Sequence, residues 1–256
     1  WLRLEGETSA PVDGDALLHM TFDNNCGSVA HAEDQPVLLA GTPTYSADVW
    51  KKKVSSGGNG SVELRENAGC IVMDPNSSVK IALPYEGLSK EELKSATIEF
   101  FVKGDPTSTP DEWCVPMKIC ANDVPFFFLM QIFSGGVYNF RVNTYDDANP
   151  TDVGTYDCRP EGAFSDGRWH HVAMTIAANE DGSSTIACYF DYRLAGEPYT
   201  PSPGCWKGLA EGMTLQLSGG WTMRFRFDEL RVSKGVLAPS RFMRARNGTG
   251  MTLSFR

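Results

Sequence analysis

The sequence predicts an all-β protein, an antiparallel sandwich of two sheets, and three observations lead to this fold class. Apolar residues recur with period two in short runs, where helices would show period 3.6 in longer ones. The 256 residues include 25 glycines and 15 prolines, which is above average usage and implies frequent turns. Turn signals such as Ser134-Gly135-Gly136, Asp166-Gly167 and Asp181-Gly182 separate the runs.

Each alternating run bounded by turn residues predicts one strand. In chain order the expected strands are Ala16–Phe22, Gly69–Met73, Ser78–Leu83, Thr97–Lys103, Phe126–Phe133, Tyr138–Thr144, His170–Ala177, Thr185–Tyr192, Met213–Leu217 and Arg224–Ser233. Two short helices are expected: Leu88–Leu93, which Ser89 and Glu92 open as a capping box, and Ala238–Arg244, which Pro239 opens. No linker or repeat divides the chain, so residues 1–256 are expected to form one domain.

The net charge of −9 and the pI near 5.0 argue against a surface that neutralises phosphates, so no nucleic-acid partner is expected. No apolar run reaches the roughly 18 residues of a transmembrane helix. The N-terminus lacks the apolar core of a signal peptide, so a signal is expected to have been removed if the protein is exported. Moderate cysteine content and the acidic balance favour an extracellular, cell-surface or periplasmic location.

The seven cysteines lack the paired spacing of a structural zinc site. Cys114 and Cys120 flank a short segment and are the pair most readily joined by a disulfide. Cys188 alternates with Ile186 and Phe190 on one face of its strand, which predicts a buried thiol.

Four segments carry a resemblance to a known family. They are Leu18–Asp23, Ala96–Lys103 (ATIEFFVK), Asp166–Ala173 (DGRWHHVA) and Phe227–Val232 (FDELRV), the last followed by Gly235–Pro239. In this order they resemble the laminin-G-like domains of the concanavalin A-like lectin/glucanase superfamily, over residues of about 16–245. The resemblance implies a jelly-roll sandwich with the first and last strands side by side. The superfamily includes lectins, carbohydrate-binding modules, glucanases, lyases and adhesive domains, so the fold does not choose among these functions.

The adjacent histidines His170 and His171 suggest a catalytic or metal site, but neighbours on a strand point to opposite faces. We therefore expect each imidazole to be held by hydrogen bonds in a structural role.

Alternation from Phe227 predicts that Asp228 shares a face with Leu230, and that Glu229 faces the other way. A carboxylate beside an apolar face needs a hydrogen bond, an ion pair or a cation. Because the resemblance places the first strand beside the last, Asp23 and Asp228 are the predicted ligands of one structural calcium ion. The alternative is that each acid caps a turn through backbone N–H groups.

Retaining glucanases need two carboxylates about 5 Å apart, and on a strand this requires acids at alternating positions. Asp228 and Glu229 are adjacent, and Glu99 has no acid two residues away on either side. Asp146, Asp147, Asp152 and Glu161 belong to or follow a segment expected to be a solvated loop, 143–156. No catalytic residue is therefore predicted.

Sugar rings stack on aromatic side chains while polar groups bind their hydroxyls. Trp113, Tyr145, Tyr156 and Trp206 occur in turn-rich polar stretches and are the predicted ligand-binding residues, although they could equally cover apolar edges beneath loops. The expected function is a non-catalytic glycan-recognition module of a secreted or surface protein. The alternatives are a structural or adhesive domain that binds a surface protein and, third, a glycoside hydrolase or polysaccharide lyase.

Overall fold

The computed structural model describes residues 16–22, 38–40, 44–50, 53–56, 63–83, 85, 89, 94–106, 113–121, 124–134, 137–146, 149–158, 166–200, 209, 211–220 and 223–243. Within 38–40, 53–56, 63–66, 113–114, 121 and 124–158 the description covers the backbone alone.

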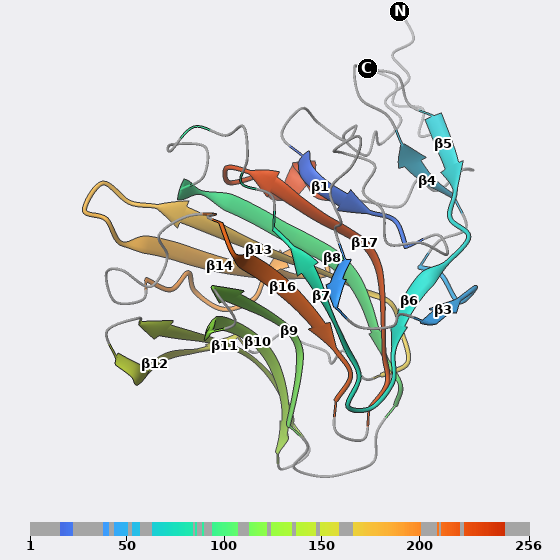
Figure 1. The fold of residues 1–256 in the computed structure, drawn as a ribbon, viewed down its shortest axis with the longest axis horizontal. Coiled ribbons are helices and arrows are strands. Elements are labelled where there is room, and N and C mark those ends of the chain that lie inside the picture. The colour runs from blue at the N-terminus through green and yellow to red at the C-terminus, as the bar shows by residue number, and fades with distance from the viewer. Residues whose placement is uncertain are drawn as a thin grey trace, which may run out of the picture.

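Two antiparallel sheets form a sandwich (Figure 1). The eight-stranded sheet, here sheet A, has the order β15-β14-β13-β8-β17-β6-β3, with β1 also paired to β17. Its strands are β1 (Ala16–Met20), β3 (Thr44–Ser46), β6 (Cys70–Met73), β8 (Ala96–Gly104), β13 (His170–Ala178), β14 (Ser184–Phe190), β15 (Arg193–Leu194) and β17 (Phe225–Lys234).

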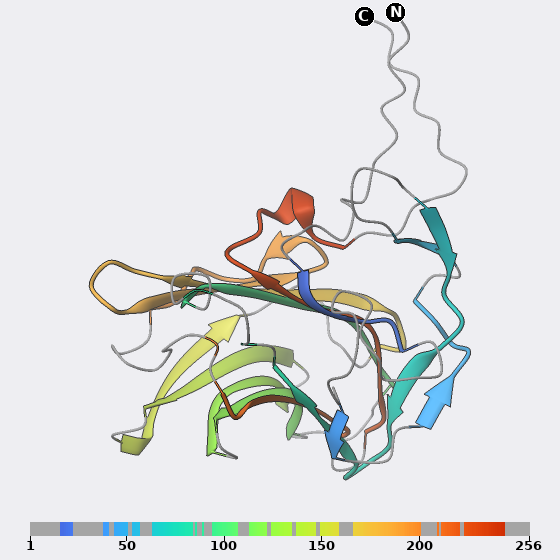
Figure 2. The same ribbon diagram turned by 45° about the horizontal axis from the view of Figure 1, so that its top comes forward.

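The seven-stranded sheet, here sheet B, has the order β12-β11-β10-β9-β16-β7-β2. Its strands are β2 (Leu38–Ala40), β7 (Ser78–Ala82), β9 (Trp113–Ala121), β10 (Val124–Ser134), β11 (Val137–Asp146), β12 (Asn149–Cys158) and β16 (Met213–Ser218). Figure 2 shows the two layers, with the strands of sheet B curving beneath sheet A. A separate hairpin pairs β4 (Lys53–Ser56) with β5 (Glu63–Glu66).

The all-β expectation is confirmed, and each of the ten predicted strands corresponds to a strand of a sheet. The predicted C-terminal helix is one 3-10 turn, η1 (Pro239–Arg241), while most of Leu88–Leu93 lies outside the described residues. The interpretation of 143–156 as a loop is wrong, because β11 and β12 form an antiparallel hairpin across it. Its second strand, β12, lacks an apolar alternation because polar residues and glycine occupy most of its positions.

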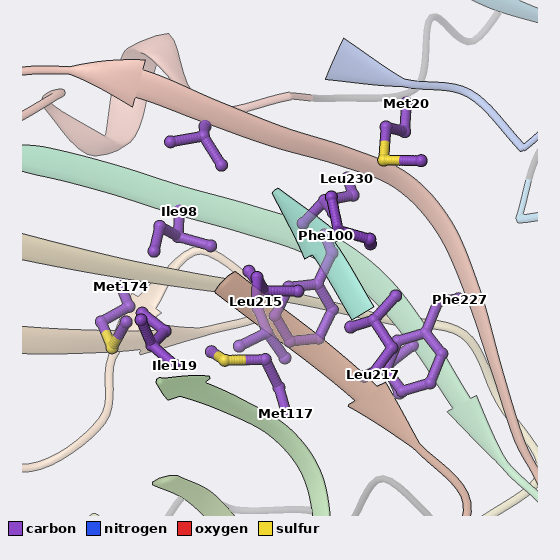
Figure 3. Packing of buried hydrophobic residues seen from close by; sticks show 14 of the residues in the cluster. Met20, Ile98, Phe100, Met117, Ile119, Met174, Leu215, Leu217, Phe227 and Leu230 are labelled. Atoms are coloured by element: carbon purple, nitrogen blue, oxygen red, sulfur yellow. The ribbon is translucent and has the colours of Figure 1, made fainter. Parts of the chain in front are cut away.

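The main core lies between the sheets, where alternate residues of both meet (Figure 3). Leu215 and Leu217 of β16 and Met117 and Ile119 of β9 come from sheet B, and each is fully buried. They face residues of sheet A that include Ile98, Phe100, Met174, Phe227 and Leu230. Burying one such side chain contributes about 1.5–3 kcal/mol, so this interface is the main source of stability.

A β-bulge in β17 changes which residues face the core. Asp228 pairs with Phe101 and Arg231 with Glu99, so β17 has one residue more than β8 between these pairs. Glu229 adopts the left-handed conformation at φ 52°. Phe227 and Leu230 therefore both enter the core, while Asp228 and Arg231 lie on the outer face. The prediction that Asp228 shares a face with Leu230 is wrong, since strict alternation does not survive a bulge.

The predicted disulfide between Cys114 and Cys120 is also wrong. Both residues lie on the one strand β9, and six residues of extended chain span roughly 20 Å, whereas a disulfide needs Cα atoms within about 7 Å. Cys188 is a buried thiol beside Ile186 and Phe190, as predicted.

Candidate functional site

The pairing of strands in sheet A brings residues of three of the motif segments together on its outer face. Arg231 Nε donates to Glu99 Oε1 at 2.8 Å, and its Nη2 also contacts this oxygen. His171 Nε2 donates to Glu99 Oε2 at 2.9 Å. Glu99 is 0% exposed, and Arg231 and His171 are 2% exposed. Each of three motif segments thus contributes one member of a buried charge network.

This network accounts for the ionisation of Glu99. Burial alone would raise the pKa of Glu99, but Arg231 and the hydrogen bond from His171 outweigh burial and lower that pKa. The backbone N–H of Met243 also donates to Glu99 Oε2 at 2.8 Å, and Arg231 Nη2 donates to the carbonyl of Arg241 at 2.9 Å. The carboxylate therefore also fixes the segment after η1 against the sheet.

The network continues toward the first strand. His19 of β1 pairs in register with Arg231, and His19 Nε2 lies 2.7 Å from Glu229 Oε2. Both side chains are almost fully buried. The bulge in β17 therefore has a function in packing, because it brings the Glu229 carboxylate to the first strand.

Aromatic side chains lie over the charged groups. The Trp50 ring stacks on Phe101 with centroids 3.4 Å apart, and Tyr192 stacks on His171 at 4.4 Å. A second apolar cluster contains Leu237 and Phe242, which close the same face. Segments distant in sequence thus cover the outer face of sheet A.

His170 lies between two carboxylates at the end of β13. Its Nδ1 donates to Asp191 Oδ2 at 2.9 Å, and its Nε2 lies 3.0 Å from Asp166 Oδ1. Burial would lower the pKa of His170, but the hydrogen bonds to Asp191 and Asp166 outweigh it and raise that pKa. Asp191 and Tyr192 form the two-residue turn between β14 and β15, both at positive φ, and the bonds of Asp191 hold this strained turn. Both histidines therefore have structural hydrogen bonds, as expected.

Asp228, the second predicted calcium ligand, is fully buried on the outer face of sheet A. Its Oδ2 accepts hydrogen bonds from the Trp50 backbone N–H at 3.0 Å and from Asn67 Nδ2 at 2.8 Å. Burial, followed by the charges of Asp228 and Asp48, raises the pKa of the neighbouring Cys70 to about 12. Asp23 lies outside the described residues. Within the described part of the chain, no three His, Cys, Asp or Glu residues are grouped to hold a metal ion.

The outer face of sheet B has a different composition. The register aligns Lys80 of β7 with Gln216 of β16, and Gln216 with Lys118 of β9. All three side chains are half-buried. The row continues through positions 128, 143 and 155, which hold Phe, Asn and Thr. Only the register between the strands shows that these positions form one row.

The predicted aromatic residues do not share one surface. Trp113 pairs with Ile132, and Tyr145 with Val153, and these registers place both positions on the outer face of sheet B. Position 156 pairs with 142 on the opposite face, toward sheet A. Trp206 lies outside the described residues. Trp113, Tyr145 and Tyr156 are on strands and not in the turn-rich segments expected, and their binding roles stay predictions.

No family model matches the chain, and no curated protein matches it. Among solved structures, the binding domain of Paraclostridial Mosquitocidal Protein 1 is similar at 12% identity over 88% of this chain, with a TM-score of 0.55. The binding domain of botulinum neurotoxin DC, solved in complex with SialylT, is similar at 12% identity over 89%, also with a TM-score of 0.55. This chain spans about half the length of each, 50%.

Domain 4 of AbnA, a GH43 extracellular arabinanase from Geobacillus stearothermophilus in complex with arabinotriose, is similar at 17% identity and a TM-score of 0.50. Here the alignment covers 89% of this chain and 96% of the arabinanase domain. At these identities the likenesses show the fold, which is a two-sheet β-sandwich used by receptor-binding and carbohydrate-binding domains. Within the described residues, no helix is long and apolar enough to span a membrane.

Proposed function

We propose that this chain is a non-catalytic glycan-recognition module of a secreted or surface protein, and that it binds its ligand on the outer face of sheet B. One observation carries the proposal. The chain covers the outer face of sheet A with its own segments, whereas the outer face of sheet B presents the half-buried Lys80, Gln216 and Lys118 in one row.

The chemistry of this row suits a carbohydrate. Amide and ammonium groups bind hydroxyls, and the aromatic positions Trp113 and Tyr145 on the same face provide planar surfaces for sugar rings. The arabinanase domain solved with arabinotriose and the neurotoxin domain solved with SialylT support the use of this fold in glycan binding.

The distribution of carboxylates supports binding without catalysis. Retaining hydrolysis needs two carboxyl groups about 5 Å apart beside the bound sugar. Among the positions that the described strands place on the outer face of sheet B, the register assigns one acid, Asp157, and no second acid to pair with it. Glu99 and Asp228 are buried under the cover of sheet A and hold structural hydrogen bonds.

We also propose a structural calcium ion held by Asp228 and Asp23. Asn67 donates to Asp228 through its Nδ2. Its Oδ1 is buried and has no hydrogen-bond partner among the described residues. Carboxylate and amide oxygens are the ligands that calcium prefers. The ion would supply positive charge to the buried Asp228 and would join the first strand to the last.

A glycan array with and without calcium tests the function, followed by titration calorimetry on each hit. We expect binding without turnover, and a loss of affinity of tenfold or more in Trp113→Ala or Tyr145→Ala, since truncation of an aromatic hot-spot residue costs about 2 kcal/mol or more. Tyr45→Ala, a half-buried tyrosine on β3 of sheet A, is the matched control and should bind normally.

The proposal is wrong if no glycan binds while a surface protein does, which would establish the adhesive alternative. Release of reducing ends that is lost in an Asp146→Ala variant would instead show an enzyme.

A further inference from the structure

The charged residues that the described strands place on the outer face of sheet B are mostly basic, although the chain is acidic. The register assigns Lys80, Lys118 and Arg141 to this face. Asp157, opposite Arg141, is the one acidic residue that the register of the described strands assigns to it. The whole chain has a net charge of −9. A basic face attracts anionic ligands, whereas the rest of an acidic protein repels them.

The two lysines are spaced regularly across the sheet. Lys80 and Lys118 are both opposite Gln216, one on each neighbouring strand. Adjacent strands lie about 4.8 Å apart, so the two lysine positions are separated by roughly 10 Å. This distance is comparable to the length of a disaccharide. A glycan lying across the strands would therefore meet one ammonium group at about every second ring, with the Gln216 amide between them.

The composition of the face selects among anionic polymers. Aromatic positions such as Trp113 and Phe128 suit the apolar faces of sugar rings. The few basic side chains on this face match a polysaccharide with a single carboxylate on a ring. A heavily sulfated polysaccharide carries more negative charge than these side chains neutralise. A nucleic acid carries a phosphate on every nucleotide, so it too has more charge than these few side chains neutralise.

From this spacing and charge we infer that the outer face of sheet B binds a polysaccharide containing uronic acids, with carboxylates at Lys80 and Lys118. The inference rests on the proposed glycan-binding function and specifies its ligand class. Ammonium groups bind carboxylates by charge-assisted hydrogen bonds, and exposed pairs of this kind weaken as salt increases.

The test compares polygalacturonate, polyglucuronate and polymannuronate oligosaccharides with the same oligosaccharides after reduction of their carboxyl groups, by titration calorimetry on the full chain. We expect at least one uronate to bind, the reduced counterpart to bind about tenfold more weakly, and affinity to fall with added salt. The double variant Lys80→Gln, Lys118→Gln should lose about tenfold in affinity. Lys94→Gln removes one exposed charge beside β8 of sheet A and should leave binding unchanged.

Different failures have different meanings. Equal binding of the reduced oligosaccharides, unchanged affinity in the double variant, or preference for a sulfated chain would overturn the uronate inference while glycan binding itself stands. Failure to bind any charged or neutral glycan would overturn the proposed function as well. The melting temperature of each variant is measured as a control, and an unchanged value shows that a loss of binding does not arise from unfolding.

Discussion

The two outer faces of the sandwich carry charged residues in the same alternating pattern but place them in different environments. Glu99 and Arg231 on sheet A are 0% and 2% exposed, whereas Lys80 and Lys118 on sheet B are half-buried. On sheet A the Glu99 carboxylate accepts hydrogen bonds from Arg231, His171 and the backbone N–H of Met243. The comparison shows that a charged residue on the outer side of a strand is not thereby a surface residue. Its role depends on whether another segment covers it.

The largest effect on stability is expected when a charge is removed from sheet A. Arg231→Met leaves Glu99 buried without its main partner, which should cost about 3–5 kcal/mol of unfolding free energy. The melting temperature should fall by about 10 °C or more in a chain of this length. Chemical denaturation measures the change. The double variant with Glu99→Met should recover part of the loss, and a fall below about 1 kcal/mol in Arg231→Met would show that water reaches the network.

Calcium should have the next largest effect, also on sheet A. An ion bound by Asp228 and Asp23 at a hundredfold its Kd stabilises the folded state by about 2.7 kcal/mol. Chelation should therefore lower the melting temperature by several degrees. Asp228→Asn should abolish the calcium response, whereas Glu229→Gln should keep it, because Glu229 is bonded to His19. A melting curve indifferent to both calcium and chelator would leave Asp228 as a hydrogen-bond acceptor for Trp50 and Asn67.

A smaller effect is expected from pH. The pKa of His170 is raised in the folded state by Asp191 and Asp166, after burial has opposed the shift. Its protonation therefore stabilises the fold fully below its unfolded pKa of about 6.5, and this contribution is lost as pH rises through the folded value. Unfolding free energy measured between pH 5 and pH 9 should decline across this window in the wild type. His170→Gln should remove that decline, and an identical profile in the variant would exclude His170 as its source.

The smallest stability effect should come from sheet B. Lys118→Gln should change the unfolding free energy by no more than about 0.5 kcal/mol, because a partly exposed side chain away from the core contributes little. The same substitution on sheet A, Lys103→Gln, breaks the 2.8 Å ion pair with Asp48 that helps to hold the Trp50 segment and should cost more. Equal losses in the two variants would mean that the outer face of sheet B is covered too.

Much of the fold was predictable because each strand is a local pattern. The alternation in His170–Ala177 predicted a strand, and β13 (His170–Ala178) buries the alternating residues Val172, Met174 and Ile176 in the core. The bulge at Glu229 and the strand β12 were missed, because a bulge follows from pairing between strands and β12 has few apolar residues. The candidate site was predicted less well. Trp113 and Tyr145 share a face, but neither the exclusion of position 156 nor the row through Lys80 and Lys118 follows from the sequence of any one strand.

The sequence by itself determined the β class, ten of the strands and the acidic net charge, since these depend on composition and on neighbours along the chain. Only the tertiary structure decided which outer face is covered. Trp50 reaches Asp228 across 178 residues, and Met243 reaches Glu99 across 144. Burial of a charge depends on such long-range packing, and the alignment of residues in a row depends on strand register. Neither property is a feature of a local sequence pattern, and together they separate the structural charges of sheet A from the proposed binding charges of sheet B.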